Sequence, residues 1–225
     1  ISITVYATQL NSENDSFGPD YDKDATYPAA YASELGSALN EGKIVALSKD
    51  ITSNDTIVVN NKTATLDANG KTVDNTDEIW NEDTGNWSLV SARNQANLTI
   101  TGNGNFKAKE NDCFAVDVQD GSTVTIKNGT FVGNVHAVYV LEGTAIIEGG
   151  TYSVQQKYSD ASKADEFVLN CYDANRANGT AKIIVKGGTF INFNPADCQA
   201  EGAHTNFVAN GYKVTSKTVG KDTYY

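Results

Sequence analysis

Three side chains in the middle of the chain are of the types that transfer protons in enzymes acting on sugars. Asp117, His136 and Tyr139 supply a carboxylate, an imidazole and a phenol. Such groups serve as general acid and base when they lie within hydrogen-bonding reach of one substrate. A row of solvated polar residues on a sheet has the same composition without a catalytic role, so both interpretations stay open.

A second set of residues suits ligand binding rather than proton transfer. The set consists of aromatic and imidazole side chains in polar segments, together with nearby acids: Trp80, Trp87, Tyr158, Phe193 and His204, with Asp83 and Asp160 and, beside them, Glu78, Asp165 and Glu166. The apolar face of a sugar stacks on an aromatic ring while its hydroxyls bond to acids and amides. The two tryptophans would equally serve to anchor their own loop, and this alternative also stays open.

An internal repeat positions these candidate residues. Five segments share the order apolar residue, outward residue, apolar residue, a turn with Gly, and then an aromatic residue or Val. The second apolar residues are Leu66, Ile100, Ile126, Ile147 and Val185, the residues before them are Thr65, Thr99, Thr125, Ile146 and Ile184, and the residues after the turns are Val73, Phe106, Phe131, Tyr152 and Phe190. Because side chains alternate along a strand, the first series should face a core and the second the outside. The aromatic residues should stack on one another.

A third short apolar strand follows each copy of the repeat. Examples are Phe114 to Val116 and Ala137 to Val140, and residues 89–90, 167–169 and 207–208 complete the series. Three strands per copy predict an all-β fold, a right-handed single-stranded parallel β-helix in which Asp117 lies beside Tyr139. An antiparallel β-sandwich also has short strands, but its hairpins give no reason for a fixed order of strand, Gly turn and aromatic residue.

The copies of the repeat are unevenly spaced, and the extra residues fall between the second and third strands. The long segments are 75–87, 153–166 and 192–205. Insertions at the same point of stacked coils emerge along one edge of a solenoid, and long loops in a compact domain are usually functional or disordered. The sequence therefore predicts a wall of loops on one edge, and this wall holds the candidate ligand-binding residues.

The segment before the repeats suggests a cover for the open end of the solenoid. Residues 27–42 place Tyr31, Leu35 and Leu39 at helical spacing and end on Gly42, a plausible helix stop. We expect a capping helix there and the β-helix over residues 43–225. Residues 1–26 read as an irregular segment, and we expect it to be linked to a missing upstream region.

Charge and composition argue against several classes of partner. Acidic residues outnumber basic ones by 28 to 17, which gives a net charge of −11 and repels nucleic acid. No apolar run reaches the roughly 18 residues of a membrane helix, so we expect no membrane insertion. Cys113, Cys171 and Cys198 have no CxxC spacing, so we expect buried thiols and no metal site. No cofactor motif occurs in a suitable context, and we expect no cofactor.

The turn sequences also resemble a known superfamily. Gly187-Gly-Thr-Phe190 and Asn128-Gly-Thr-Phe131, with the stretch from Ala64 to Val73 before the first full coil, are similar to turns of the pectate-lyase-like right-handed β-helix proteins. The block from Gly187 to Val214 resembles an ending found in β-helix surface and fibre proteins of gut bacteria and their tailed phages. The resemblance implies the β-helix fold over roughly residues 40–214.

The chain departs from the enzymes of that superfamily. Its pectate lyases use an Asp cluster for calcium with a nearby Arg or Lys as base, and its hydrolases use close paired Asp residues with a Gly-His-Gly motif. Neither set can be placed in this sequence, because His136 lies in Asn-Val-His-Ala and Arg93 and Arg176 fall on different coils.

These expectations combine into one functional hypothesis. The chain reads as a non-enzymatic β-helix module of an extracellular, cell-surface, fibre or phage virion protein that binds a glycan or a surface protein through loops on one edge. The alternative is a polysaccharide lyase or glycoside hydrolase that uses Asp117, Tyr139 and His136. Ile146 and Ile184 stand where earlier coils have Thr, and such an apolar strip suits a contact between chains. Phage fibres of the β-helix proteins that the chain resembles are commonly trimers, so the resemblance implies that this contact lies within a homotrimer.

Overall fold

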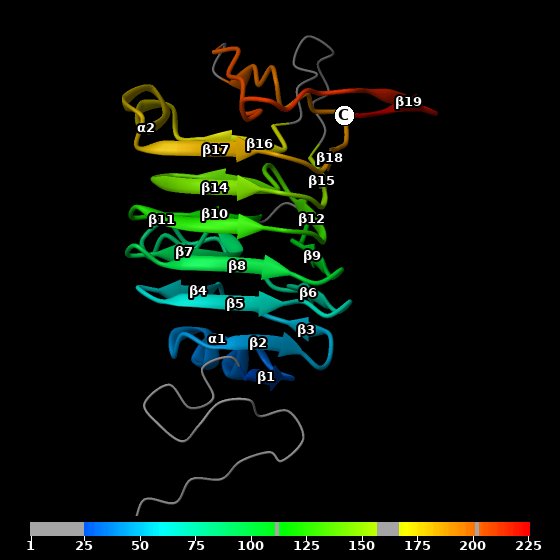
Figure 1. The fold of residues 1–225 in the computed structure, drawn as a ribbon. Coiled ribbons are helices and arrows are strands. Elements are labelled where there is room, and N and C mark those ends of the chain that lie inside the picture. The colour runs from blue at the N-terminus through cyan, green and yellow to red at the C-terminus, as the bar shows by residue number, and fades with distance from the viewer. Residues whose placement is uncertain (1–24, 111–112, 157–166, 201–202) are drawn as a thin grey trace, which may run out of the picture.

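The protein is a solenoid of stacked parallel coils in a computed structural model that describes residues 25–110, 113–156, 167–200 and 203–225 (Figure 1). Each full coil adds one strand to each of three parallel sheets. The first sheet contains β1 (Thr26–Ala29), β2 (Ile44–Leu47), β5 (Thr63–Asp67), β8 (Asn97–Thr101), β11 (Ser122–Ile126), β14 (Gly143–Ile147) and β17 (Ala181–Val185). This arrangement is the parallel β-helix that the repeat predicts.

The other two sheets follow the same order along the solenoid. The second sheet contains β3 (Ile51–Thr52), β6 (Thr72–Asp74), β9 (Asn105–Lys107), β12 (Thr130–Gly133), β15 (Thr151–Val154) and β18 (Thr189–Phe190). The third sheet contains β4 (Ile57–Asn60), β7 (Ser88–Arg93), β10 (Phe114–Val118), β13 (Val138–Val140) and β16 (Leu169–Cys171). Apart from β1 and β2, no strand of these sheets pairs with the next strand in the sequence, so each coil depends on the coils above and below it.

The predicted core series of the first sheet is in register. Leu66 pairs with Ile100, Ile100 with Ile126, Ile126 with Ile147, and Ile147 with Val185. All are buried, with exposed fractions between 0% and 5%. The outward series is also in register, with Ile146 beside Ile184, and both of these side chains are half-buried.

The aromatic residues of the second sheet form one continuous stack. Phe106, Phe131, Tyr152 and Phe190 follow one another with ring centroids 4.9, 5.2 and 5.1 Å apart and interplanar angles of 4°, 11° and 15°. These distances match the spacing of hydrogen-bonded strands, roughly 4.8 Å. The predicted stacking is therefore confirmed, and the strand spacing is what sets it.

The N-terminal end of the solenoid is covered by α1 (Ala32–Asn40), which is shorter than the helix expected over residues 27–42. Leu35 and Leu39 are fully buried, and the helix packs against β1, β2, β4 and β5. Residues 26–29 form the edge strand β1, although residues 27–29 were expected in the helix. An edge strand accommodates Pro28 because its outer side needs no N–H donor. Gly42 has φ +79°, a left-handed conformation suited to the expected helix stop.

The C-terminal end differs more from the sequence expectation. The parallel strands end at β18 instead of continuing to residue 225, and residues 207–208 do not form a third strand. Val208 pairs with Val185 of the first sheet. The short helix α2 (Asp173–Asn178) precedes β17, and β19 (Lys217–Val219) and β20 (Asp222–Tyr224) form an antiparallel hairpin that extends sideways from this end (Figure 1).

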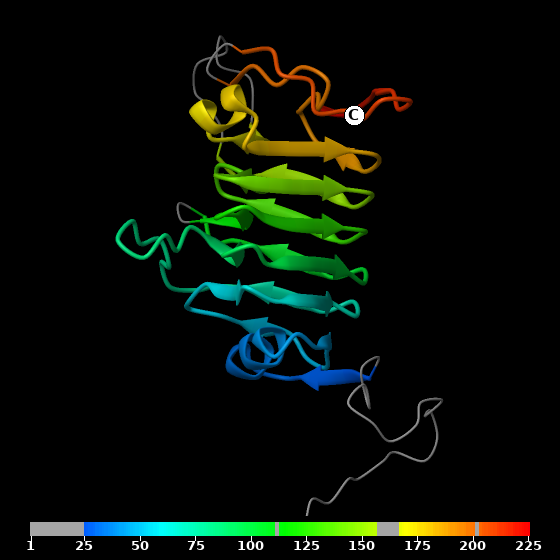
Figure 2. The same cartoon turned by 60° about the vertical axis from the view of Figure 1, so that its left-hand side comes forward.

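The predicted long connection of residues 75–87 lies between the second and third sheets. The segment 192–205 follows β18 and leads to no strand of the third sheet, and residues 157–166 lie outside the described part of the chain. Residues 75–87 join β6 to β7, and Figure 2 shows this segment projecting from the side of the solenoid. The corresponding connections from β9 to β10 and from β12 to β13 are short. Cys113, Cys171 and Cys198 are free and buried, as expected for buried thiols.

Candidate functional site

The candidate site is built on the third sheet, where the segment 75–87 is fixed to strands β7 and β10. Arg93 donates hydrogen bonds to the carbonyls of Thr84 and Gly85 at 3.0 and 2.7 Å. Gln119, at the end of β10, donates to the same Gly85 carbonyl at 2.8 Å. An antiparallel bridge between Asn81 and Asn86 closes the segment on itself. The segment is thus a folded unit held by two long side chains of the sheet.

An aromatic cluster joins this segment to three successive coils. Its members, called the aromatic platform below, are Trp80, Trp87, Phe114, His136 and Tyr139. Trp80 stands edge-on to Phe114 with centroids 5.3 Å apart and lies 6.2 Å from Trp87. Phe114 lies 5.0 Å from both His136 and Tyr139, and the last two rings stack at 5.4 Å with an interplanar angle of 9°.

Exposure separates the members of the platform into two groups. Phe114 and His136 are 6% and 7% exposed, whereas Trp80 is 42% exposed. The indole N–H of Trp80 donates to Glu82 at 3.0 Å. Trp87 is half-buried, and its indole nitrogen has no hydrogen-bond partner among the described residues. Trp87, the more buried of the two tryptophans, anchors the segment 75–87 to the solenoid. Trp80 contacts Phe114 and Trp87, but a large part of its side chain remains exposed to solvent.

Asp117 occupies the predicted register beside Tyr139, but it is buried rather than solvated. It pairs with Tyr139 across β10 and β13 and has no exposed surface. Ser88 donates to its Oδ1 at 2.7 Å, and Gln119 donates to its Oδ2. With no exposed surface, this carboxylate is not in contact with solvent.

Burial also shifts the acid–base properties of all three proton-transfer candidates. It raises the pKa of the Asp117 carboxyl group, although hydrogen bonds from Ser91, Ser88 and Gln119 and the charge of Arg93 act in the opposite direction. It lowers the pKa of His136 to about 4 and raises the pKa of Tyr139 to about 12. His136 is therefore neutral at pH 7.

The tautomer of His136 follows from its hydrogen bond. Its Nδ1 lies 2.6 Å from the carbonyl oxygen of Phe167. Because a carbonyl only accepts, the neutral ring carries its proton on Nδ1. The ring is consequently fixed as a stacked, uncharged member of the platform.

The other sequence candidates are dispersed. Phe193 is 4% exposed and packs on Phe190 at the end of the aromatic stack, with the two ring centroids 6.4 Å apart, so its ring offers little surface to a ligand. His204 is exposed on the C-terminal side of the last coil and pairs with Asp197 at 2.7 Å. Asp83 is exposed at the tip of the segment 75–87. Tyr158 and Asp160, like Asp165 and Glu166, lie outside the described residues.

One residue of the site was missed in the sequence. Phe114, assigned only to a strand, contacts Trp80, His136 and Tyr139 at the centre of the platform. The available signal was its position one coil before the segment from His136 to Tyr139.

Other kinds of site are not seen in the described part of the chain. No group of three or more His, Cys, Asp or Glu side chains there is arranged to hold a metal ion. No helix among these residues has the length and apolar character needed to cross a membrane. Comparisons of the chain with protein-family models, curated proteins and solved structures give no significant match.

Proposed function

We propose that this chain is a non-enzymatic binding module that holds a glycan against the aromatic platform. The observation that supports the proposal most directly is the state of Trp80, whose ring is 42% exposed although Phe114 and Trp87 fix its position. A fixed, partly exposed indole offers a flat apolar surface at little conformational cost, which is what stacking on a sugar ring requires.

The charges around Trp80 favour an uncharged glycan. Glu78 and Asp83 are exposed in the same segment, and Glu82 accepts the hydrogen bond of the indole. Lys109 lies 3.6 Å from Glu78 and is paired with it. An acidic sugar would be repelled, whereas the hydroxyls of a neutral sugar would find carboxylate acceptors.

The proposed setting is an extracellular, cell-surface, fibre or virion protein of the pectate-lyase-like β-helix type. The turn sequences that resemble this superfamily and the parallel coils of the fold are consistent with it, and the net charge of −11 argues against nucleic acid as a partner. A surface protein is the second partner class, and the same platform would serve it.

The enzymatic alternative receives less support from the site. Glycoside hydrolysis of the usual kind needs two carboxyl groups on either side of the bond to be cleaved. Asp117 is enclosed, and its neighbours His136 and Tyr139 are uncharged near pH 7. We therefore expect binding without turnover.

A glycan array probed with the purified chain tests this function. We expect neutral glycans among the bound spots, loss of those signals in Trp80→Ala, and retention in Tyr31→Ala. Tyr31 is a matched control because it is 60% exposed and precedes α1 at the other end of the solenoid. Reducing-end and unsaturated-product assays on the bound glycans should stay at background. Release of sugar product would replace this proposal with the enzymatic one, and an array without signal would remove the glycan as partner.

A further inference from the structure

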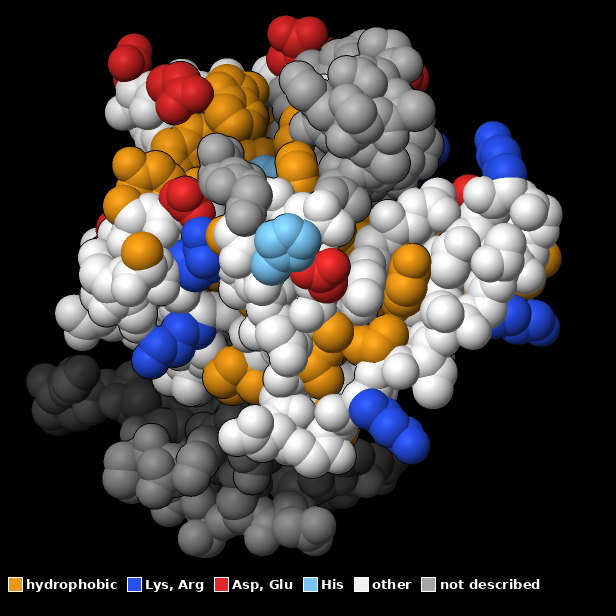
Figure 3. Space-filling view, turned by 90° about the horizontal axis from the view of Figure 1, so that it is seen from above, with side chains coloured by type: hydrophobic (Ala, Val, Ile, Leu, Met, Phe, Trp, Pro, Cys, Tyr) orange, Lys and Arg blue, Asp and Glu red, His pale blue; other side chains and the backbone are white. Residues whose placement is uncertain are grey.

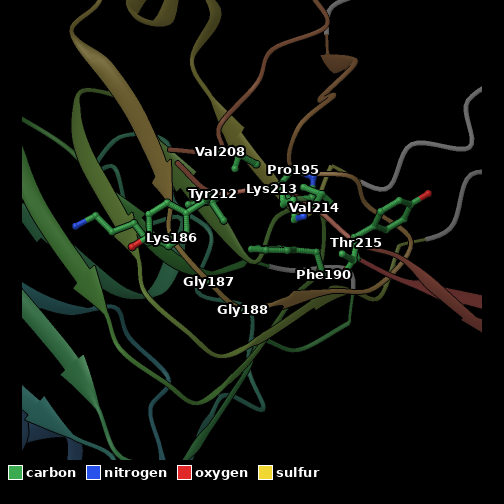
Figure 4. Close-up of a pocket in the computed structure, with 12 residues that line it drawn as sticks. Lys186, Gly187, Gly188, Phe190, Pro195, Val208, Tyr212, Lys213, Val214 and Thr215 are labelled. Carbon is green, nitrogen blue, oxygen red and sulfur yellow. The ribbon is translucent and has the colours of Figure 1, made fainter. Parts of the chain in front are cut away.

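The C-terminal end of the solenoid is closed by an irregular segment, residues 191–200 and 203–209, called the C-terminal cover below. Figure 3 looks onto this end of the molecule. Figure 4 shows Pro195 and Val208 of the cover near Phe190 of the last coil, and all three line one cavity. The buried side chains of the cover include Phe193, Cys198, Ala200 and Phe207, with exposed fractions between 2% and 6%. The cover therefore shields this end of the core as α1 shields the other.

The cover contacts each of the three sheets of the last coil. Phe193 packs on the second sheet, and the N–H of Val185 in the first sheet donates to the carbonyl of Phe207 at 2.8 Å. Cys198 lies over the third sheet, where its Sγ is 3.7 Å from the carbonyl oxygen of Leu169 in β16. Cys198 is thus a contact between the cover and the third sheet.

A second set of contacts holds the main chain of Cys198. It exchanges hydrogen bonds of 2.8 and 2.7 Å with Thr205, whose hydroxyl accepts a further bond of 2.9 Å from Arg176 of α2. Strand β16 ends at Cys171, and α2 begins shortly after it. The contacts of Cys198 and of its partner Thr205 therefore lead to the two elements that meet at Cys171.

Cys171 turns its side chain into the same core. Leu169 and Cys171 are 0% and 3% exposed and alternate with the half-buried Asn170, so both face inward. Val118 and Val140 hold the equivalent inward position in the two coils below Cys171. Because no further coil follows, the next level above Cys171 is supplied by the cover.

The two thiols also influence each other electrostatically. Burial raises the pKa of the Cys171 thiol to about 12, the charge of Arg176 acts in the opposite direction, and a charge on Cys198 raises the pKa further. Cysteines that form a disulfide have Cα atoms roughly 4.4–6.8 Å apart. This range includes the spacing of adjacent strands, roughly 4.8 Å, so two inward cysteines on successive levels of the solenoid meet the distance requirement.

We propose that Cys171 and Cys198 form a disulfide bond in the presence of a small-molecule disulfide, and that this bond fastens the C-terminal cover to the third sheet. The thiolate of Cys198 attacks one sulfur of the small disulfide, and one small thiolate leaves. The thiolate of Cys171 then attacks Sγ of Cys198 and displaces the second small thiolate. The two cysteines thereby lose two electrons and two protons, which the small disulfide takes up.

Burial of the two thiols determines when this exchange takes place. Since both side chains are enclosed, the oxidant reaches them before the cover closes during folding, or during local opening of the cover. Disulfides form and persist in the oxidising surroundings of secreted proteins. The bond therefore suits the extracellular setting proposed above, but it requires neither the aromatic platform nor a glycan.

Refolding of the chain with oxidised glutathione, followed by a thiol count in denaturant, tests the proposal. We expect Cys113 to remain as a thiol, whereas all three cysteines react in the chain kept under a reductant. A tryptic digest should join the peptide of residues 164–176 to that of residues 187–213 and leave Cys113 as a thiol in residues 110–127. Three thiols after oxidation, glutathione adducts in place of the joined peptides, or a bond from Cys113 would overturn the proposal.

A comparison of thermal midpoints tests whether the bond fastens the cover. The oxidised chain should unfold roughly 5–10 °C above the reduced chain, because the bond restricts the unfolded chain between Cys171 and Cys198. Cys198→Ser should abolish this difference. Cys113→Ser should keep it and is the matched control, since Cys113 is also fully buried but lies two coils below, before β10. Equal midpoints of the oxidised and reduced natural chain, or a difference that persists in Cys198→Ser, would contradict the proposal. If a variant does not fold, the peptide map of the unaltered chain decides the question.

Discussion

The hydroxyl of Ser88 donates a hydrogen bond of 2.7 Å to Oδ1 of Asp117, and neither residue has any exposed surface. Asp117 is in turn linked through Gln119 to Gly85 of the projecting segment. A buried carboxyl group thus belongs to the network that fixes the segment carrying Trp80. Asp117 thereby connects β7 and β10 to the segment that carries Trp80.

Substitution of Asp117 by Asn should alter stability in a pH-dependent way. Because burial raises the pKa of this carboxyl group above its unfolded value, its contribution to stability is complete below the unfolded pKa and declines as pH rises through the folded pKa. The neutral amide of Asn has no such dependence. In urea unfolding at pH 4 and pH 7, the stability of Asp117→Asn relative to the natural chain should increase with pH. An identical difference at both values would contradict this account.

His136 should produce the opposite dependence. Its pKa is lowered to about 4, so the unfolded chain binds a proton more readily and stability falls as pH drops from about 6.5 to 4. The shift corresponds to a loss of about 3 kcal/mol at most. His136→Phe keeps a ring between Phe114 and Tyr139 and should lack this loss. The difference in unfolding free energy between the two chains across this pH range is the measurement, and parallel pH profiles would contradict the prediction.

The repeat made the coils and their register predictable, because each inward residue has an equivalent one coil away. Leu66 to Val185 in the first sheet and Phe106 to Phe190 in the second were correctly aligned for this reason. The ends were less predictable, since a terminal coil has no neighbour to impose the pattern. Residues 26–29 and 207–208 were assigned to the wrong elements there.

The site was only partly predictable. The sequence placed Trp80 and Trp87 on an inserted loop and Asp117 beside Tyr139, and both statements agree with the structure. It gave no sign that the loop folds back on β7 and β10, because that contact depends on Arg93 and Gln119, two polar residues with no periodic pattern. The sequence left Asp117 open as a proton-transfer group or a solvated residue, and it gave no sign that this side chain is fully buried.

The central coils should depend strongly on their inward residues. Ile126 is fully buried between coils on both sides. Ile126→Ala should lower the unfolding free energy by about 2–5 kcal/mol because the cavity is enclosed. Ile146→Ala, on the outward face of the next coil, should cost clearly less. Equal effects of the two substitutions in denaturant titrations would argue against the assigned inward and outward faces.

The outward pair Ile146 and Ile184 is the predicted contact of a homotrimer. The two side chains are adjacent in β14 and β17 and half-buried within one chain. Replacement of both by Thr, the residue of the earlier coils, should shift the molar mass measured by light scattering from trimer toward monomer. The same mass before and after the double substitution would rule out this strip as the contact.

The most direct test of the account is the affinity of Trp80→Ala for a neutral glycan identified on the array, measured by calorimetry together with the thermal midpoint. We predict binding weakened by about 1–3 kcal/mol with a nearly unchanged midpoint, because Trp80 is 42% exposed and Phe114 remains packed on His136 and Tyr139. Trp87→Ala, which removes the anchor, should lower the midpoint. Unchanged affinity in a folded Trp80→Ala chain would contradict the assignment of the platform as the glycan site.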